Sequence, residues 1–315
     1  MRIGLIDIDY NGSFPNIALM KLSAWHKRQG DDVEFYMPFS DRYDRVYVSK
    51  VFSFSPDYQD CINADEVIYG GTGYHIQLVN GRETWVTPTK AKFMEQLPEE
   101  VEHSCPDYSL YPKLTENTAY GFLTRGCPRG CKFCHVEAKE GKRSVKVANL
   151  SEFWSGQKNI VLCDPNILAC KEWKSLLQQL IDSKAYVDFN QGLDARLMTK
   201  EKAHMLGEIK IKEIHFAWDR YEDKEAVLKG LQIYSEHARK RPHGHNAIVF
   251  TIVNFDTDIE QDLERIYTLR EMGYWAYVMI YDKEHAHPEY RHLARWCNDR
   301  AIFAVTERYE DYLIR

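Results

Sequence analysis

Hydrophobic and polar positions alternate at two spacings along the first hundred residues, and the alternation predicts strands and a helix. Residues 3–8 form a short apolar run that is typical of a strand. Residues 15–30 carry Ile17, Met20 and Ala24 on one face, which indicates a helix with a Pro in its first turn and a Gly at its end. Further short strands are predicted at 33–36, 45–48 and 66–69. Strands that alternate with helices favour a parallel sheet, so we expect a Rossmann-like or flavodoxin-like α/β domain.

From about residue 118 the pattern becomes six strand–helix repeats. The helices show apolar positions three and four residues apart, as at Trp173, Leu176, Leu177 and Leu180. The six predicted strands are 120–123, 159–163, 186–190, 213–218, 248–255 and 275–281. We therefore expect a first α/β domain with its linker at 1–112, and a second α/β domain at 113–315 that ends in a short carboxy-terminal helix.

Composition and charge are those of an ordinary globular chain. Its 315 residues leave room for two domains, and it is 44% hydrophobic and 28% charged. The amino terminus runs directly into a predicted strand, and no apolar run approaches the roughly 20 residues that span a bilayer. We expect a cytoplasmic protein with no membrane partner. The net charge of −6 does not indicate a nucleic-acid partner, and the basic stretch 239–245 is interpreted as a solvent-exposed loop.

Three of the eight cysteines lie within eight residues and form the pattern C-x3-C-x2-C at Cys127, Cys131 and Cys134. Three thiolates on one loop can hold three irons of a [4Fe–4S] cluster and leave the fourth iron open to a small molecule. Zinc is an alternative, with these three cysteines and His135 or a distant residue as the four ligands. A disulfide is disfavoured because cytoplasmic thiols stay reduced.

This cysteine pattern, with Phe133 just before its last cysteine and the strand-like run 119–124 before it, resembles the radical S-adenosylmethionine (radical SAM) superfamily. The resemblance implies a partial (β/α)6 barrel and a [4Fe–4S] cluster held by the three cysteines. It also implies reductive cleavage of S-adenosylmethionine (SAM) to a 5′-deoxyadenosyl radical, which abstracts hydrogen from a substrate that the sequence does not identify. The electron would come from a donor such as flavodoxin or ferredoxin. Such chemistry belongs to the cofactors, and the protein supplies binding and orientation.

The resemblance also implies which residues contact SAM, because reactive groups of α/β barrels follow the strand ends. Phe133 would place its backbone near the adenine. The four other predicted contacts are Asp164 for the amino group, Arg196 for the carboxylate, and Asp219 and Asn254 for the ribose hydroxyls. The family's Gly-Gly-Glu motif is absent at the second strand, and Asp164 stands in for its Glu by inference.

The first domain resembles the cobalamin-binding-type domain of one radical SAM branch, through the Gly70-Gly71-Thr72-Gly73 loop and the linker at 97–109. Its loop at 7–12 lacks the His that ligates cobalt in that branch. Cobalamin therefore stays an alternative cofactor, bound without a His ligand if at all. Two alternative functions stay open: a cobalamin-dependent radical SAM methyltransferase, and a non-enzymatic zinc or iron–sulfur binding protein.

Overall fold

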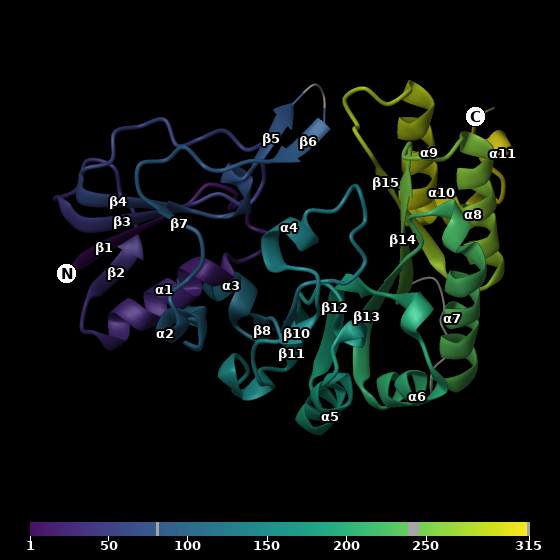
Figure 1. Ribbon diagram of the computed structural model, residues 1–315, viewed down its shortest axis with the longest axis horizontal. Helices are drawn as coiled ribbons and strands as arrows, with labels where there is room; N and C mark the ends of the chain where they lie inside the picture. The colour runs from purple at the N-terminus through teal and green to yellow at the C-terminus, as the bar shows by residue number, and fades with distance from the viewer. Residues whose placement is uncertain (80–81, 239–245, 314–315) are drawn as a thin grey trace. The chain divides into compact units, whose positions relative to one another are not determined.

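The computed structural model describes residues 1–79, 82–238 and 246–313 (Figure 1). The predicted basic loop 239–245 lies outside the described residues. The chain forms two compact units, Met1–Gly121 with Ala148–Ile160, and Phe122–Val147 with Val161–Arg315. The structure contains a five-stranded and a six-stranded sheet, and the strand pairs described in both are parallel, which confirms the predicted α/β class.

The sheet of the first unit has the strand order β2-β1-β3-β4-β7. Its elements are β1 Arg2–Asp7, α1 Ile17–Arg28, β2 Asp32–Phe35, β3 Tyr43–Ser49, β4 Ala64–Gly70 and β7 Phe93–Met94. The predicted helix and the four predicted strands are thus confirmed. Helix α1 begins after Asn16, whose side chain accepts a hydrogen bond from the backbone N–H of Leu19 and so caps the helix.

The two faces of this sheet are covered differently. On one face, Ile3 and Leu5 of β1 pack with Leu19 and Leu22 of α1. On the other face, Ile6 belongs to a core cluster with Tyr43, Val46 and Val48, against which Tyr58 and Ile62 pack. The fully described connections 36–42 and 50–63 contain no helix. Loop side chains therefore cover the face where a doubly wound sheet has helices.

Several short elements of the first unit carry no strong hydrophobic period and were not predicted. Strands β5 and β6 pair antiparallel. The short elements are η1 Thr72–Tyr74, β5 Ile76–Val79, β6 Arg82–Trp85, α2 Glu99–Glu102, η2 Tyr108–Leu110, α3 Pro112–Thr115 and η3 Leu150–Glu152.

The six-stranded sheet has the order β15-β14-β13-β12-β11-β8, so its strands follow one another in chain order. The strands are β8 Thr118–Gly121, β11 Asn159–Leu162, β12 Tyr186–Leu193, β13 Lys210–Ala217, β14 Ala247–Val253 and β15 Trp275–Ile280. Each of the six predicted strands is confirmed, with ends that differ by a few residues.

Helices lie along one side of this sheet (Figure 1). They are α5 Trp173–Ser183, α6 Lys200–Glu208, α7 Lys224–His237 and α8 Ile259–Glu271, with the short turns η4 Ile167–Ala169, η5 Ala195–Leu197 and η6 Tyr221–Asp223. Phe216 of β13 points toward them, because its ring lies 5.1 Å from that of Tyr234 on α7. Side chains alternate along a strand, so Glu213 and His215 of β13 lie on the opposite face, which we call the inner face.

Three helices follow β15 where the sequence predicts one short helix: α9 Pro288–Asn298, α10 Arg300–Val305 and α11 Tyr309–Leu313. Asn298 ends α9 beside the edge strand. Its Oδ1 accepts a hydrogen bond from the backbone N–H of Val278 (2.7 Å), and its Nδ2 donates to the Val278 carbonyl (2.9 Å). One side-chain amide thus satisfies both backbone groups of an edge residue.

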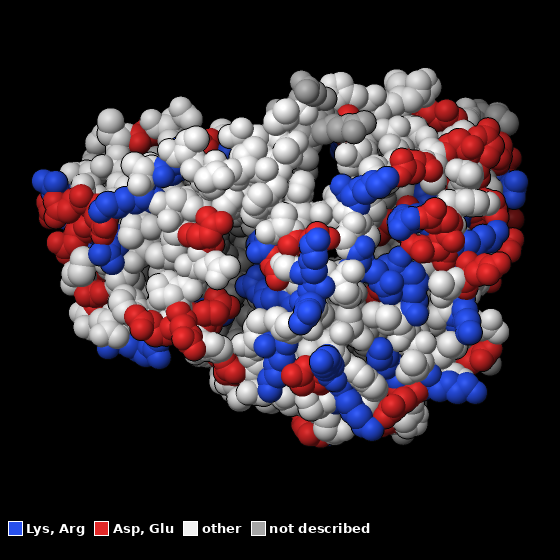
Figure 2. Space-filling model, in the orientation of Figure 1, with Lys and Arg blue, Asp and Glu red and all other residues white. Residues whose placement is uncertain are grey.

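Within the described residues, no helix combines the length and apolar character that crossing a bilayer requires. Acidic and basic side chains lie interspersed over the face seen in Figure 2.

Candidate functional site

The loop with the three cysteines leaves a two-stranded ribbon, in which β9 (Thr124–Arg125) pairs antiparallel with β10 (Val145–Lys146). The loop ends in the short helix α4 (Val136–Glu140). Gly126 stands at its start with φ of +82°, and a Cβ there would lie 2.2 Å from the carbonyl oxygen of Arg143. Only glycine fits this close approach, so the backbone itself fixes the path into the cysteine loop.

Asp164 follows β11, and its side chain holds residues 123–124, which lead into the two-stranded ribbon, by hydrogen bonds. Its carboxylate accepts hydrogen bonds from the backbone N–H of Leu123 (3.1 Å) and from the N–H (2.5 Å) and hydroxyl (2.7 Å) of Thr124. The side chain is buried, and this burial raises the pKa of Asp164 to about 6, against the opposing effect of these hydrogen bonds. The residue that we predicted for the SAM amino group therefore positions the cysteine loop from inside the protein.

The cysteine loop contacts the residues that follow three strands of the sheet. After β11, Asn166 donates from Nδ2 to the Cys127 sulfur over 3.5 Å. After β12, Asp194 accepts a hydrogen bond from Nε of Arg129 in the loop. After β14, Phe255 packs edge-on against Phe133, with ring centres 5.3 Å apart. The cysteine loop is thus held at the carboxyl ends of the parallel strands.

Arg196 lies in a network of ion pairs at the end of β12. Its Nε donates to Asp194 (2.7 Å) and its Nη1 donates to Asp223. Burial opposes ionisation of Asp194, but its hydrogen bond to Arg196 and the nearby Arg129 guanidinium hold the pKa of Asp194 below its usual value. Within the described residues Nη2 of Arg196 has no hydrogen-bond partner, which leaves one donor edge for a carboxylate ligand.

Asp219 and Asn254 follow β13 and β14. Oδ1 of Asp219 accepts from the backbone N–H of Ile252 over 3.3 Å, and burial raises the pKa of Asp219 to about 6 while Arg265 and Arg196 oppose the rise. Asn254 has φ of +64°, an unusual conformation for a residue other than glycine. Its Nδ2 donates to the carbonyl of Tyr281, so Oδ1 is the group left to meet a ligand.

The pKa values of Cys131 and Cys134 depend on the neighbouring thiols and on Asp219. Burial raises the pKa of Cys131, and Cys134 and Asp219 raise it further. Burial likewise raises the pKa of Cys134, with Cys127 and Asp219 adding to the rise. Three thiolates on this loop therefore repel one another unless a cationic centre lies among them, and an iron–sulfur cluster is such a centre. The donor set fits the cluster that the cysteine pattern predicts.

A single zinc ion is the alternative centre for these thiols. Across residues 1–79, 82–238 and 246–313, no group of three or more His, Cys, Asp or Glu side chains is arranged to hold one metal ion. A cubane cluster takes one thiolate per iron and zinc takes four N or S ligands, so three thiols on one loop are a donor set that either centre can use.

The structure brings seven of the eight predicted residues to one edge of the sheet and buries the eighth. Cys127, Cys131, Cys134, Phe133, Arg196, Asp219 and Asn254 lie on the cysteine loop or directly at strand ends, and Asp164 is turned inward. Sequence reasoning missed the roles of Arg129, Asn166 and Asp194. Asn166 and Asp194 each follow a predicted strand, and this position at a strand end was the only sequence feature that pointed to a role near the site. Their contacts to the cysteine loop span 39 and 65 residues of sequence, and no local pattern predicts them.

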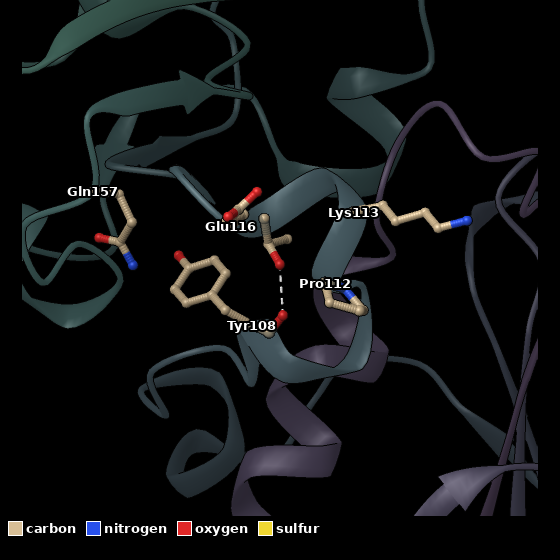
Figure 3. Close-up of a pocket in the computed structure, with 6 residues that line it drawn as sticks. Tyr108, Pro112, Lys113, Glu116 and Gln157 are labelled. Carbon is tan, nitrogen blue, oxygen red and sulfur yellow. Dashed lines mark hydrogen bonds between the residues drawn. The ribbon is translucent and has the colours of Figure 1, made fainter.

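A separate open hollow of about 550 Å³ lies in the first unit (Figure 3). Its lining residues are Tyr108, Pro112, Lys113, Thr115, Glu116 and Gln157. The Thr115 hydroxyl donates to the Tyr108 carbonyl over 2.5 Å. None of the predicted site residues lines this hollow, so it is distinct from the candidate site.

The sequence matches no protein-family model, and a search of the curated proteins finds no similar protein. Fold and site together define the class: an α/β protein that carries a three-cysteine loop at the carboxyl edge of a parallel sheet.

The raised pKa of Asp219 leads to a stability prediction for the protein without cofactors. The folded pKa is about 6 against an ordinary value of 3.8, so the free energy of unfolding falls as the pH rises from about 4 to about 6. Asp219→Asn keeps an acceptor for the Ile252 N–H but does not titrate. We expect it to raise the free energy of unfolding by about 3 kcal/mol at pH 7 and to change it little near pH 4. Urea denaturation at both pH values measures this, and a variant destabilised at pH 7 would contradict it.

Proposed function

We propose that this chain is a radical SAM enzyme that acts on a substrate still to be identified. One observation carries the proposal: the C-x3-C-x2-C loop is held against residues at the carboxyl ends of β11, β12 and β14. Reactive groups of parallel α/β proteins gather at this edge. The six strands in chain order also agree with the partial (β/α)6 barrel that the sequence resemblance implies.

Cys127, Cys131 and Cys134 would hold the cluster. When bound, a reduced [4Fe–4S] cluster would supply one electron to the sulfonium of SAM, and the cleavage would give methionine and a 5′-deoxyadenosyl radical able to take a hydrogen atom from the substrate. The chain's own residues support the loop. Asn166 donates a hydrogen bond to the Cys127 sulfur, a kind of contact that tunes the reduction potential of such clusters. Asp164 anchors the strand before the loop.

Three other side chains would orient SAM. Arg196 offers its Nη2 edge to the carboxylate, while Asp194 and Asp223 fix the guanidinium in place. The Asp219 carboxylate accepts ribose hydroxyls best when it is ionised, which its pKa of about 6 permits at neutral pH. Phe133, held by Phe255, would place the loop backbone along the adenine.

The first unit is proposed as a Rossmann-like domain without the cobalt-ligating His. The loop at 7–12, where that His would stand, begins with Asp7. The Asp7 carboxylate accepts hydrogen bonds from the Tyr111 hydroxyl (2.6 Å) and from Asn16 Nδ2 (3.3 Å). Gly71 has φ of +105°, and a Cβ there would lie 2.2 Å from the Lys50 carbonyl oxygen. This close approach of two backbone segments accounts for Gly71 without any ligand, so the 70–73 loop adds no support for cobalamin.

Anaerobic reconstitution tests the proposal. The purified chain is incubated with iron and sulfide, reduced with dithionite, mixed with SAM, and followed by iron analysis, electron paramagnetic resonance (EPR) and 5′-deoxyadenosine release. We expect about four irons per chain, an EPR signal that shifts on addition of SAM, and release of 5′-deoxyadenosine. One tightly held zinc without cluster or SAM cleavage would overturn the proposal and favour a non-enzymatic metal-binding protein.

A further inference from the structure

The guanidinium of Arg265, on α8, joins the ends of two neighbouring strands. Its Nη1 donates hydrogen bonds to the carbonyls of Trp218 (2.6 Å) and Asp219 (3.0 Å), the two residues that follow β13. Its Nη2 donates to the carbonyl of Ile252 (2.6 Å), near the end of β14, the strand that pairs with β13. The side chain of Arg265 is 0% exposed. A buried arginine thus spans the carboxyl ends of β13 and β14.

The same contacts fix the carboxylate of Asp219. Its Oδ1 accepts a hydrogen bond from the backbone N–H of Ile252 (3.3 Å). Arg265 holds the carbonyl groups of both residues in this hydrogen bond, so Arg265, Asp219 and Ile252 form a closed ring of three contacts. Asp219 is partly exposed, and within the described residues its Oδ2 has no hydrogen-bond partner. Oδ2 is therefore the atom that is left to accept a ligand hydroxyl.

Asp262 holds the guanidinium in its turn. Nη2 of Arg265 donates to Oδ1 of Asp262 (2.5 Å), and neither side chain is exposed. Burial raises the pKa of Asp262, whereas Arg265, the Thr257 hydroxyl and the backbone N–H of Asn254 oppose the rise. The ion pair therefore acts on the residues that follow both strands, and a charged pair with partners on each side stays ionised in the interior.

The charge of Arg265 also acts on Asp219. Burial raises the pKa of Asp219 to about 6, whereas the Ile252 N–H, Arg265 and Arg196 oppose the rise and Asp223 adds to it. The other titratable groups that interact with this carboxylate are Cys131 and Cys134 of the cysteine loop. Loss of the guanidinium would move the titration of Asp219 to higher pH, because a nearby positive charge favours the carboxylate form.

We propose that Arg265 is a positioning residue of the candidate site, which holds the Asp219 carboxylate in place and ionised for a ligand hydroxyl. An arginine that only stabilised the fold would have no need to contact the residue that meets the ligand, whereas Arg265 binds the carbonyl of Asp219 itself. The assignment of this hydroxyl to the ribose of SAM rests on the proposed function.

The test is isothermal titration calorimetry of the full chain with adenosine and with 2′,3′-dideoxyadenosine, which lacks both ribose hydroxyls. At pH 7.5 Asp219 is ionised, so we expect the unmodified chain to bind adenosine about tenfold more tightly than the dideoxy analogue. This preference should fall as the pH is lowered through about 6, where Asp219 gains a proton. Asp219→Asn should remove the pH dependence, because the amide does not titrate.

Two variants of Arg265 separate its contacts from its charge. Arg265→Lys keeps a positive charge but loses the fork that binds two strands, so adenosine should bind about tenfold more weakly. In the Asp219→Asn background the same substitution should change the affinity less than about twofold, because its effect passes through Asp219. Arg265→Met combined with Asp262→Asn leaves no unpaired buried charge and should move the midpoint of the pH profile upward. Arg270→Met, on the same helix and partly exposed, should alter neither affinity nor midpoint.

Three results would overturn the proposal: no preference for adenosine, an unshifted midpoint in the double variant, or an equal loss of affinity from Arg265→Lys with and without Asp219. Circular dichroism checks folding of each variant. If the double variant does not fold, Arg265→Lys with Asp219→Asn carries the comparison. The titration needs no cluster. Coupling of Arg265 to Asp219 without SAM cleavage would leave the positioning role standing and refute the radical SAM function, and SAM cleavage without the coupling would refute only the positioning role.

Discussion

Replacing Cys134 by Ala should abolish 5′-deoxyadenosine release after anaerobic reconstitution. Cys134 is one of only three thiols on the loop, so its loss leaves two protein ligands for a cluster that needs three to stay anchored with one open iron. Cys127→Ala and Cys131→Ala should have the same effect. Iron content, EPR intensity and product release should all fall to background, because the ligand and the catalytic step are lost together.

The matched control is Cys61→Ala, which removes an exposed thiol that lies outside the cysteine loop. This variant should bind iron and cleave SAM as the unmodified chain does. Equal loss in Cys61→Ala would show that the cysteine requirement is not specific to the loop. Full activity in Cys134→Ala would refute the assignment of Cys134 as a cluster ligand.

The second large effect concerns stability and involves Arg265, a fully buried arginine on α8. Its guanidinium donates to the carbonyls of Trp218 (2.6 Å) and Asp219 (3.0 Å), to that of Ile252 (2.6 Å), and to the carboxylate of Asp262 (2.5 Å). Both charged side chains are 0% exposed. Arg265→Met leaves the Asp262 charge buried without its partner, so we expect a loss of about 3–5 kcal/mol in the free energy of unfolding.

Urea denaturation at pH 7 measures the loss, with Arg270→Met as the control on the same helix. Arg270 is partly exposed and bonds the carbonyls of Thr306 and Glu307, so its replacement should cost about 1 kcal/mol or less. The double variant Asp262→Asn with Arg265→Met removes the unpaired charge and should recover part of the loss. Equal effects of Arg265→Met and Arg270→Met would show that the buried ion pair does not stabilise the sheet end.

The strands were predictable because their signal is local. Apolar runs such as 159–163 and 248–255 contain hydrophobic residues of the core; β11 lies within the first run, and β14 overlaps the second over residues 248–253. The cysteine loop was equally visible, since its chemistry lies within eight consecutive residues. By contrast, β6 has the sequence Arg-Glu-Thr-Trp, which contains no apolar run, so the antiparallel pair of β5 and β6 was not predicted.

The sequence predicted which residues lie near the cysteine loop only where it predicted the end of a strand. Arg196 and Asp219 were expected at the carboxyl edge and lie there. Whether a side chain at such an end faces outward is decided by tertiary packing. Asp164 turns inward because the N–H groups of Leu123 and Thr124 need an acceptor, and these residues lie forty positions earlier in the chain.

The side-chain amide of Asn298 has a consequence for the protein in a crowded solution. A sheet whose strands follow chain order ends in β15, and an end strand with free N–H and C=O groups invites pairing with another molecule. Asn298 occupies both backbone groups of Val278 in the middle of that strand, where an incoming strand would need them. Helix α9 therefore works as a built-in barrier to aggregation, and the sheet can stay open at this end without recruiting a second copy of the chain.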